Sequence, residues 1–199
     1  MTPQIHLHVL ASGSKGNAAV VEGPAGSVLI DDGIARRTLL ARASKLGVNM
    51  GDVRAVLLTH EHTDHVSGLP VFANHFDGPL FATAGTISAR ERLSQLPFEV
   101  INHTDALELC GMHVTVFPTS HDVADPVGFR FATTDENGVA CGRPGLLHRH
   151  GRAYRRGRPS AHRAAACSRY ESNHASACLP RAPTRLPQAA HPRSPGAPL

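Results

Sequence analysis

Thr59-His60-Glu61-His62-Thr63-Asp64-His65 is the stretch that decides how the rest of this chain is interpreted. It follows the apolar run Ala55-Val56-Leu57-Leu58, which has the length of a buried strand. Alternate residues of an extended chain point the same way, so the first two histidines can reach one cation together. A helix that begins just beyond would turn the aspartate and the last histidine toward a neighbouring point. The spacing therefore predicts two metal sites side by side.

The types of ligand narrow the choice of metal. Neutral imidazole suits zinc and similar ions, and a carboxylate among the ligands leaves manganese or iron open. A histidine cluster can also be a polar run on the surface, but four constrained residues at the end of a strand favour metal binding. We therefore interpret this stretch as a metal centre.

Several segments of the sequence resemble one protein family. HEHTDH, residues 60–65, is similar to the HxHxDH signature of the metallo-β-lactamase superfamily. Residues 11–18 (ASGSKGNA) and 28–33 (VLIDDG) resemble the WalJ or YycJ-like branch of that superfamily, and residues 120–129 (SHDVADPVGF) agree with the branch in content and order. The resemblance covers residues 1 to about 140.

The resemblance implies a fold and a set of ligands. The fold is the α/β, four-layer αββα sandwich of the superfamily, of which this chain holds only the N-terminal half. Two divalent ions are implied, with zinc or manganese as the metal. One ion would be bound by His60, His62 and His121, and the other by Asp64 and His65.

Two further roles depend on the resemblance alone. A lone histidine after a strand is ordinary, and only the family pattern makes His121 a ligand. The family also implies that Asp31 accepts hydrogen bonds that support the metal-binding loop. Without the family pattern, Asp31 and Asp32 would be interpreted as turn-forming residues, and for Asp32 this alternative stays open.

Hydrolysis is the reaction that the resemblance implies. Two cations about 3.5 to 4 Å apart generate a hydroxide near neutral pH and stabilise the attacking and leaving oxygens. The expected substrate is a phosphodiester bond of DNA, cut exonucleolytically, with Asp64 as the catalytic residue that helps to hold the second ion. The superfamily also contains thioester hydrolases and lactonases, so acyl hydrolysis is the first alternative. The second is a non-catalytic nucleic-acid binder that acts through a basic tail.

The loop formed by residues 12–17 is a candidate contact for the substrate. Its backbone N–H groups, together with Ser14, Lys15 and Asn17, can hold an anionic oxygen such as that of a phosphate. Two glycines in such a loop more often mean a simple connection between the strands of a hairpin. This alternative also stays open.

Apolar periodicity predicts the elements around these motifs. Strands are expected at residues 5–9, 18–22, 27–30, 55–58, 80–83, 113–117 and 127–133. Helices are expected at residues 34–46, with a stop at Gly47, and at residues 86–96. A short helix should follow the metal motif, limited or bent by Pro70. Asn137-Gly138 predicts the turn of a second hairpin.

The two parts of the chain differ in composition. Residues 1–140 carry nine Lys and Arg against fifteen Asp and Glu, whereas residues 141–199 carry eleven Arg and one acidic residue, Glu171. The second part has no Val, Ile, Phe or Met and holds eight of the fifteen prolines. Such a segment is expected to form neither strands nor a packed core. We therefore predict an incomplete metallo-β-lactamase-like domain at residues 1–140 and a disordered tail at residues 141–199.

Out-of-frame translation of GC-rich DNA would also produce this tail. Residues 143–150, back-translated with permitted codons and read one base later, give Asp-Leu-Gly-Tyr-Phe-Thr-Asp, which resembles the family motif with the aspartate that bridges the metals. Residues 196–199 give Gly-His-Leu in the same way, like the motif of the family's last histidine ligand. Residues 171–174 (ESNH) resemble the family in the frame as given, which stands against a single slip.

The missing ligands lead to an expectation about activity. Without the bridging aspartate and the late histidine, the second metal site is incomplete, so we expect weak or absent activity. A half-sandwich would also expose strand edges, which predicts poor solubility and low stability. The sequence holds no apolar run of about 18 residues. It also shows no basic segment followed by an apolar one at its start. We expect a cytoplasmic protein with a nucleic-acid substrate and no membrane partner.

Overall fold

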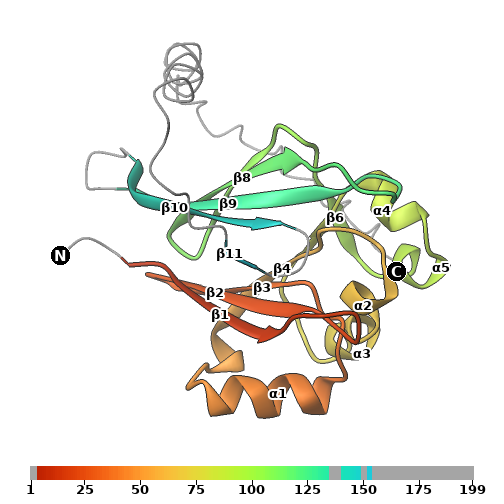
Figure 1. Ribbon diagram of the computed structural model, residues 1–199, viewed down its shortest axis with the longest axis horizontal. Helices are drawn as coiled ribbons and strands as arrows, with labels where there is room; N and C mark the ends of the chain where they lie inside the picture. The colour runs from red at the N-terminus through yellow and green to blue at the C-terminus, as the bar shows by residue number, and fades with distance from the viewer. Residues whose placement is uncertain (1–3, 135–139, 149–151, 154–199) are drawn as a thin grey trace, which may run out of the picture. The chain divides into compact units, whose positions relative to one another are not determined.

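The computed structural model describes residues 4–134, 140–148 and 152–153. All of them lie within the structural unit of residues 1–155. They form two sheets, one with the strand order β1-β2-β3-β4-β5-β6 and one with the order β11-β10-β9-β8-β7 (Figure 1).

The first sheet joins an antiparallel part to a parallel part. Its strands are β1 (His6–Ala11), β2 (Ala18–Gly23), β3 (Gly26–Ile30), β4 (Val53–Leu57), β5 (Leu80–Ala82) and β6 (Phe98–Val100). The pairings from β1 to β3 are antiparallel, and those from β3 to β6 are parallel. In β4 every residue except Arg54 is buried, as is usual for a central parallel strand. Because Ile30 pairs with Leu57, the C-terminal ends of β3 and β4 meet at one edge of the sheet.

The helices lie against this first sheet. They are α1 (Arg36–Lys45), the 3-10 helix η1 (Met50–Asp52), α2 (Thr63–Val66), α3 (Leu69–Ala73), α4 (Ala84–Ser88) and α5 (Glu91–Ser94). The predicted stop of the first helix is confirmed, because Gly47 follows it in the left-handed conformation with φ of +72°. Pro70 is the second residue of α3 and lies in its first turn, where proline is tolerated, so it does not bend a longer helix. The single helix predicted at residues 86–96 is wrong, since the extended backbone of Arg90 divides it into α4 and α5.

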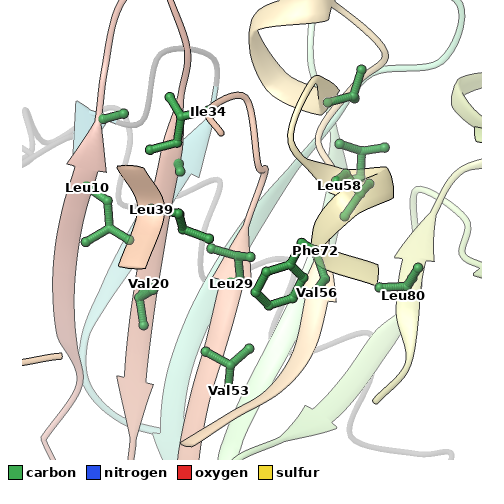
Figure 2. Close-up of a cluster of buried hydrophobic side chains, with 14 of the residues drawn as sticks. Leu10, Val20, Leu29, Ile34, Leu39, Val53, Val56, Leu58, Phe72 and Leu80 are labelled. Carbon is green, nitrogen blue, oxygen red and sulfur yellow. The ribbon is translucent and has the colours of Figure 1, made fainter. Parts of the chain in front are cut away.

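One apolar core lies between the helices and the first sheet. Each α-helix in the described part of the chain contributes at least one apolar side chain to it. Figure 2 shows Leu39 of α1 and Phe72 of α3 together with Leu29 and Val56 of the sheet. Burial of each such side chain contributes about 2 kcal/mol. This core fixes the sheet edge from which the metal motif extends.

A second core lies between the two sheets. The second sheet is antiparallel and consists of β7 (Ala106–Leu109), β8 (Met112–Pro118), β9 (Val127–Thr134), β10 (Ala140–His148) and β11 (Arg152–Ala153). Val28 and Leu57 of the first sheet pack in one cluster with Val114 and Phe129 of the second. The layers are therefore helices, sheet and sheet, which are three of the four layers in the predicted αββα sandwich (Figure 1).

Strand β10 begins at the last residue of the predicted domain, and β11 lies beyond that end. The expectation that residues 141–199 form no strands is wrong for β10 and β11. Strand β10 pairs with β9, with a register shift between Cys141 and Gly145. Because this pairing uses backbone groups, the amino-acid composition of the segment did not predict it. The predicted turn at residues 135–138 and the predicted disorder of the remaining tail fall outside the residues that the structure describes. Within those residues, no helix has the length and apolar character needed to cross a membrane.

Candidate metal centre

The metal motif leaves the C-terminal end of β4 and enters α2. Leu58 and Thr59 continue the buried path of the strand, and His62 directly precedes the first residue of α2. Asp31 follows β3 at the same edge of the sheet, where its N–H donates to the Leu57 carbonyl at 3.0 Å. The predicted arrangement of a strand end followed by a helix is therefore confirmed for this stretch.

Three histidines meet at this edge of the sheet. His60 and His62 come from the metal motif, and His121 comes from the loop between β8 and β9 of the second sheet. One ring nitrogen from each of them lies within 4.8 Å of the other two. Their ring centroids are 4.7 to 4.9 Å apart, and the rings meet edge to face. This three-histidine cluster can offer three nitrogen donors to one ion.

The hydrogen bonds of Thr59 determine which nitrogen of His60 is free to bind a metal. The Thr59 hydroxyl donates its single proton to the Asp31 carboxylate at 2.8 Å, so it accepts from His60 Nδ1, which lies 2.9 Å away. The lone pair of His60 is then on Nε2, which is buried and has no hydrogen-bond partner among the described residues. Burial and the neighbouring charge of His65 lower the pKa of His60 to about 4. The imidazole is thus neutral at pH 7, as a metal ligand must be.

Asp64 and His65 form a second group of donors beside the cluster. The Asp31 carboxylate accepts a 2.7 Å hydrogen bond from His65 Nδ1–H, which leaves the lone pair of His65 on Nε2. That nitrogen lies 3.7 Å from Asp64 Oδ2, and the rings of His65 and His60 are 4.0 Å apart. Burial acts to lower the pKa of His65, but the hydrogen bond and charge of Asp31, together with the charge of Asp64, raise it above its ordinary value.

Asp31 is the acceptor that orders this loop. Besides His65, its carboxylate accepts hydrogen bonds from the Thr59 N–H at 2.8 Å and from the Thr59 hydroxyl. Its φ of +55° lies in the left-handed region, which costs a residue other than glycine on the order of 1 kcal/mol. These contacts fit the role that the sequence predicts for Asp31. They also reveal Thr59, which sequence reasoning treated only as the end of a strand.

The residues of the predicted phosphate loop separate into two kinds. Ser14 and Lys15 are exposed, whereas Asn17 is buried. The Asn17 amide nitrogen lies 2.9 Å from Asp64 Oδ2 and 3.1 Å from His65 Nε2, and the Asn17 N–H donates to the Asp64 carbonyl at 2.7 Å. Asn17 therefore contacts the second group of donors directly, which the sequence did not predict.

Two more acidic residues near the motif are buried, and their roles were not predicted. Asp32 is fully buried, and burial, with a smaller effect from the charge of Asp31, raises its pKa to about 7. Glu61, between the first two histidines, is 8% exposed and contacts the loop that carries His121. No local pattern marks either residue, since aspartate is common in turns and Glu61 occupies an unspecified position of the HxHxDH signature.

The donor set fits divalent metal ions. The first group offers three imidazole nitrogens, including the buried Nε2 of His60, and the second offers a carboxylate oxygen beside an imidazole nitrogen. Imidazole suits zinc, and the carboxylate leaves manganese open. The predicted ligands His60, His62 and His121 lie together, and Asp64 and His65 lie next to them.

Comparison with known proteins agrees with this geometry. The sequence model of the metallo-beta-lactamase superfamily matches residues 11–153. The chain is 34% identical over 131 residues to exodeoxyribonuclease YycJ of Bacillus anthracis, an alignment that covers 64% of this chain and 50% of the relative. It is 28% identical over 137 residues to exodeoxyribonuclease WalJ of Streptococcus pneumoniae, covering 66% and 51% of the two chains. The chain thus spans about half the length of the curated relatives it matches.

The solved structures show the same fold. The metallo-beta-lactamase SMB-1 superposes with a TM-score of 0.55 at 16% sequence identity, covering 71% of this chain and 60% of that one. At this identity the likeness shows the fold alone. The predicted α/β sandwich is confirmed by this likeness.

Proposed function

The chain belongs to the metallo-beta-lactamase superfamily, and on this premise we propose that it is a metal-dependent hydrolase that cleaves phosphodiester bonds of DNA exonucleolytically. The observation that carries the proposal is the meeting of the three-histidine cluster with Asp64 and His65 at one edge of the sheet. The similarity to the exodeoxyribonucleases YycJ and WalJ supports DNA as the class of substrate.

The roles of the side chains follow from their contacts. His60, His62 and His121 would hold one ion, and Asp64 and His65 would contribute to a second. Divalent ions held there would act as Lewis acids and activate water near neutral pH. Asp31 accepts a hydrogen bond from His65 Nδ1–H, and this bond orients the ring so that Nε2, the nitrogen that would bind the metal, points away from Asp31. Asp64 is the residue we assign to catalysis, because its carboxylate is the anionic donor of the pair.

The exposed loop before β2 is the proposed contact for the substrate. Ser14 and Lys15 are open to solvent, and Asn17 ties the end of the same loop to Asp64. A lysine ammonium can pair with a phosphate oxygen as a point charge. The loop thus offers a cation to an anionic substrate at a fixed place beside the second group of donors.

We further propose that this chain is a weak enzyme. The residues that the structure describes supply two donors for the second ion, Asp64 and His65, whereas the first ion has three. An ion with two protein ligands is held less tightly than one with three, so catalysis that needs both ions should be slow. Robust turnover by the purified chain would contradict this part of the proposal.

The test compares substrates and variants on the full 199-residue chain. End-labelled single-stranded and double-stranded DNA would be incubated with the protein and with zinc or manganese. We expect slow, metal-dependent release of short products, which His62→Ala abolishes and the matched control Thr63→Ala, at an exposed neighbouring position, retains.

The alternatives give different results in the same assay. Hydrolysis of a thioester or lactone, with DNA left intact, would favour an acyl hydrolase. DNA binding that weakens with salt and survives His62→Ala would favour a non-catalytic binder that acts through the basic tail. That tail lies outside the described residues except for β10 and β11.

A further inference from the structure

The loop that carries His121 reaches the metal centre from the second sheet. Its ends are fixed by the backbone, because the Thr119 N–H donates to the Pro126 carbonyl at 3.1 Å and the Val127 N–H donates to the Thr59 carbonyl at 3.0 Å. These two bonds determine where the loop leaves and rejoins the sheet. The position of the segment between them depends on other contacts.

Glu61 makes one of these contacts from within the metal motif. Its Oε1 accepts a hydrogen bond from the Ala124 N–H at 2.8 Å, and the side chain is almost fully buried. Hydrogen bonds to a carboxylate are about twice as strong as those between neutral groups. Glu61 thus joins the segment that supplies His60 and His62 to the loop that supplies His121.

A different set of contacts holds the next residue of the loop. The Asp125 carbonyl accepts hydrogen bonds from the Thr83 hydroxyl at 2.7 Å and from the Thr86 hydroxyl at 3.2 Å, and His103 Nε2 lies 2.5 Å from Asp125 Oδ1. These contacts attach the loop to the region around α4 and to the segment after β6. Glu61 is a side chain of the metal motif that hydrogen-bonds to the backbone in the interior of this loop.

We propose that Glu61 is a positioning residue for the first metal ion, which fixes the His121 loop against the segment of His60 and His62. The proposal rests on the proposed function only in taking these three histidines as metal ligands. Without the Glu61 contact, residues 121–124 would have to be ordered when the ion binds, and this ordering lowers affinity. Loss of a partner that orients metal ligands typically lowers metal affinity about ten- to a hundredfold.

The experiment measures metal affinity instead of turnover. Zinc affinity of the full chain would be determined at pH 7 by competition with a chromophoric chelator, and cobalt binding would be followed by its visible absorption. Glu61→Ala should bind zinc at least about tenfold more weakly than the wild type and show weaker cobalt bands. Glu61→Gln keeps an oxygen for the Ala124 N–H and should stay within about threefold of the wild type. Glu22→Ala, which removes an exposed carboxylate paired with His8, should change nothing.

The variant results separate this inference from the proposed function. If His62→Ala loses zinc and Glu61→Ala retains it, the positioning role is wrong and the metal centre stands. If His62→Ala binds zinc as the wild type does, both the metal centre and the positioning role are wrong. If Glu61→Gln loses as much affinity as Glu61→Ala, the hydrogen bond to Ala124 is not the cause and the inference fails.

A measurement without any variant covers the case in which Glu61→Ala does not fold. The Ala124 amide of the wild-type protein should exchange its hydrogen slowly, because Glu61 holds it. Exchange at the rate of an open loop would overturn the inference.

Discussion

The two groups of metal donors differ in how the chain brings them together and in what surrounds them. His60, His62 and His121 come from both sheets and face one another, and burial with neighbouring imidazoles lowers the pKa of His60 to about 4. Asp64 and His65 are neighbours in sequence, and the surrounding carboxylates raise the pKa of His65 despite its burial. One seven-residue stretch therefore contains one histidine whose pKa is lowered and one whose pKa is raised.

The largest expected effect comes from removing one donor of each group in turn. His62→Ala should weaken binding of the first ion by about a hundredfold or more, because two of three nitrogen donors remain. Asp64→Ala should leave the affinity for the first ion nearly unchanged and abolish binding of the second ion. Isothermal titration with zinc, fitted to two sites, measures both constants. If each variant weakened both ions equally, the division into two groups would be wrong.

A change of pH should have a smaller effect on zinc affinity, and we expect this effect at the second group of donors. His65 has a raised pKa, so an ion must displace a proton from it once the pH falls below that pKa, and affinity should drop about tenfold for each further unit. His60 has a pKa of about 4 and stays unprotonated between pH 7 and pH 5, so it adds no such loss there. Zinc titrations at pH 7, 6 and 5 should show the affinity for the second ion falling as the pH is lowered. An affinity for the second ion that stays constant over this range would contradict the prediction.

The smallest of these effects is expected at Asn17. Its amide nitrogen lies within hydrogen-bond distance of Asp64 Oδ2. Asn17→Ala should leave that carboxylate without this support and lower the affinity for the second ion about fivefold, with little change in the affinity for the first ion. The matched control is Ser14→Ala on the same loop, where the side chain is exposed. Equal losses in both variants would show that the loop as a whole, and not the Asn17 amide, supports Asp64.

The sequence predicts the parts of this site that depend on local spacing. Alternation placed His60 and His62 on one side of an extended segment, and the strand end before them is where the structure has it. His121 follows a strand as predicted, but only the family pattern marked it as a ligand. Periodicity carries no information about which loop of the second sheet meets the first.

Other features could not be predicted because they depend on contacts between distant segments. Thr59 determines the free nitrogen of His60 only because Asp31, which follows a different strand, accepts its proton. Glu61 acts across 63 positions of sequence on Ala124. The spacing of residues in the sequence predicts neither contact. Both become visible only when the ends of β3 and β4 and the His121 loop are placed together.

The errors in the predicted elements have a similar origin. The apolar pattern of residues 86–96 is helical, but periodicity does not register that Arg90 adopts an extended backbone. The composition after residue 140 predicts no strands, yet β10 pairs with β9 through main-chain groups that every residue except proline carries in full. Composition therefore does not exclude backbone pairing at the side of an existing strand.

The origin of the first three donors on two different sheets has a thermodynamic consequence. His60 and His62 extend from the first sheet, and His121 belongs to the second, so an ion bound to all three acts as a removable cross-link between them. An ion that binds only the docked sheets stabilises them by about 2.7 kcal/mol when its free concentration is a hundred times Kd. The unfolding temperature of this chain should then rise with the zinc concentration, because the bound ion links the two sheets and is lost when they separate.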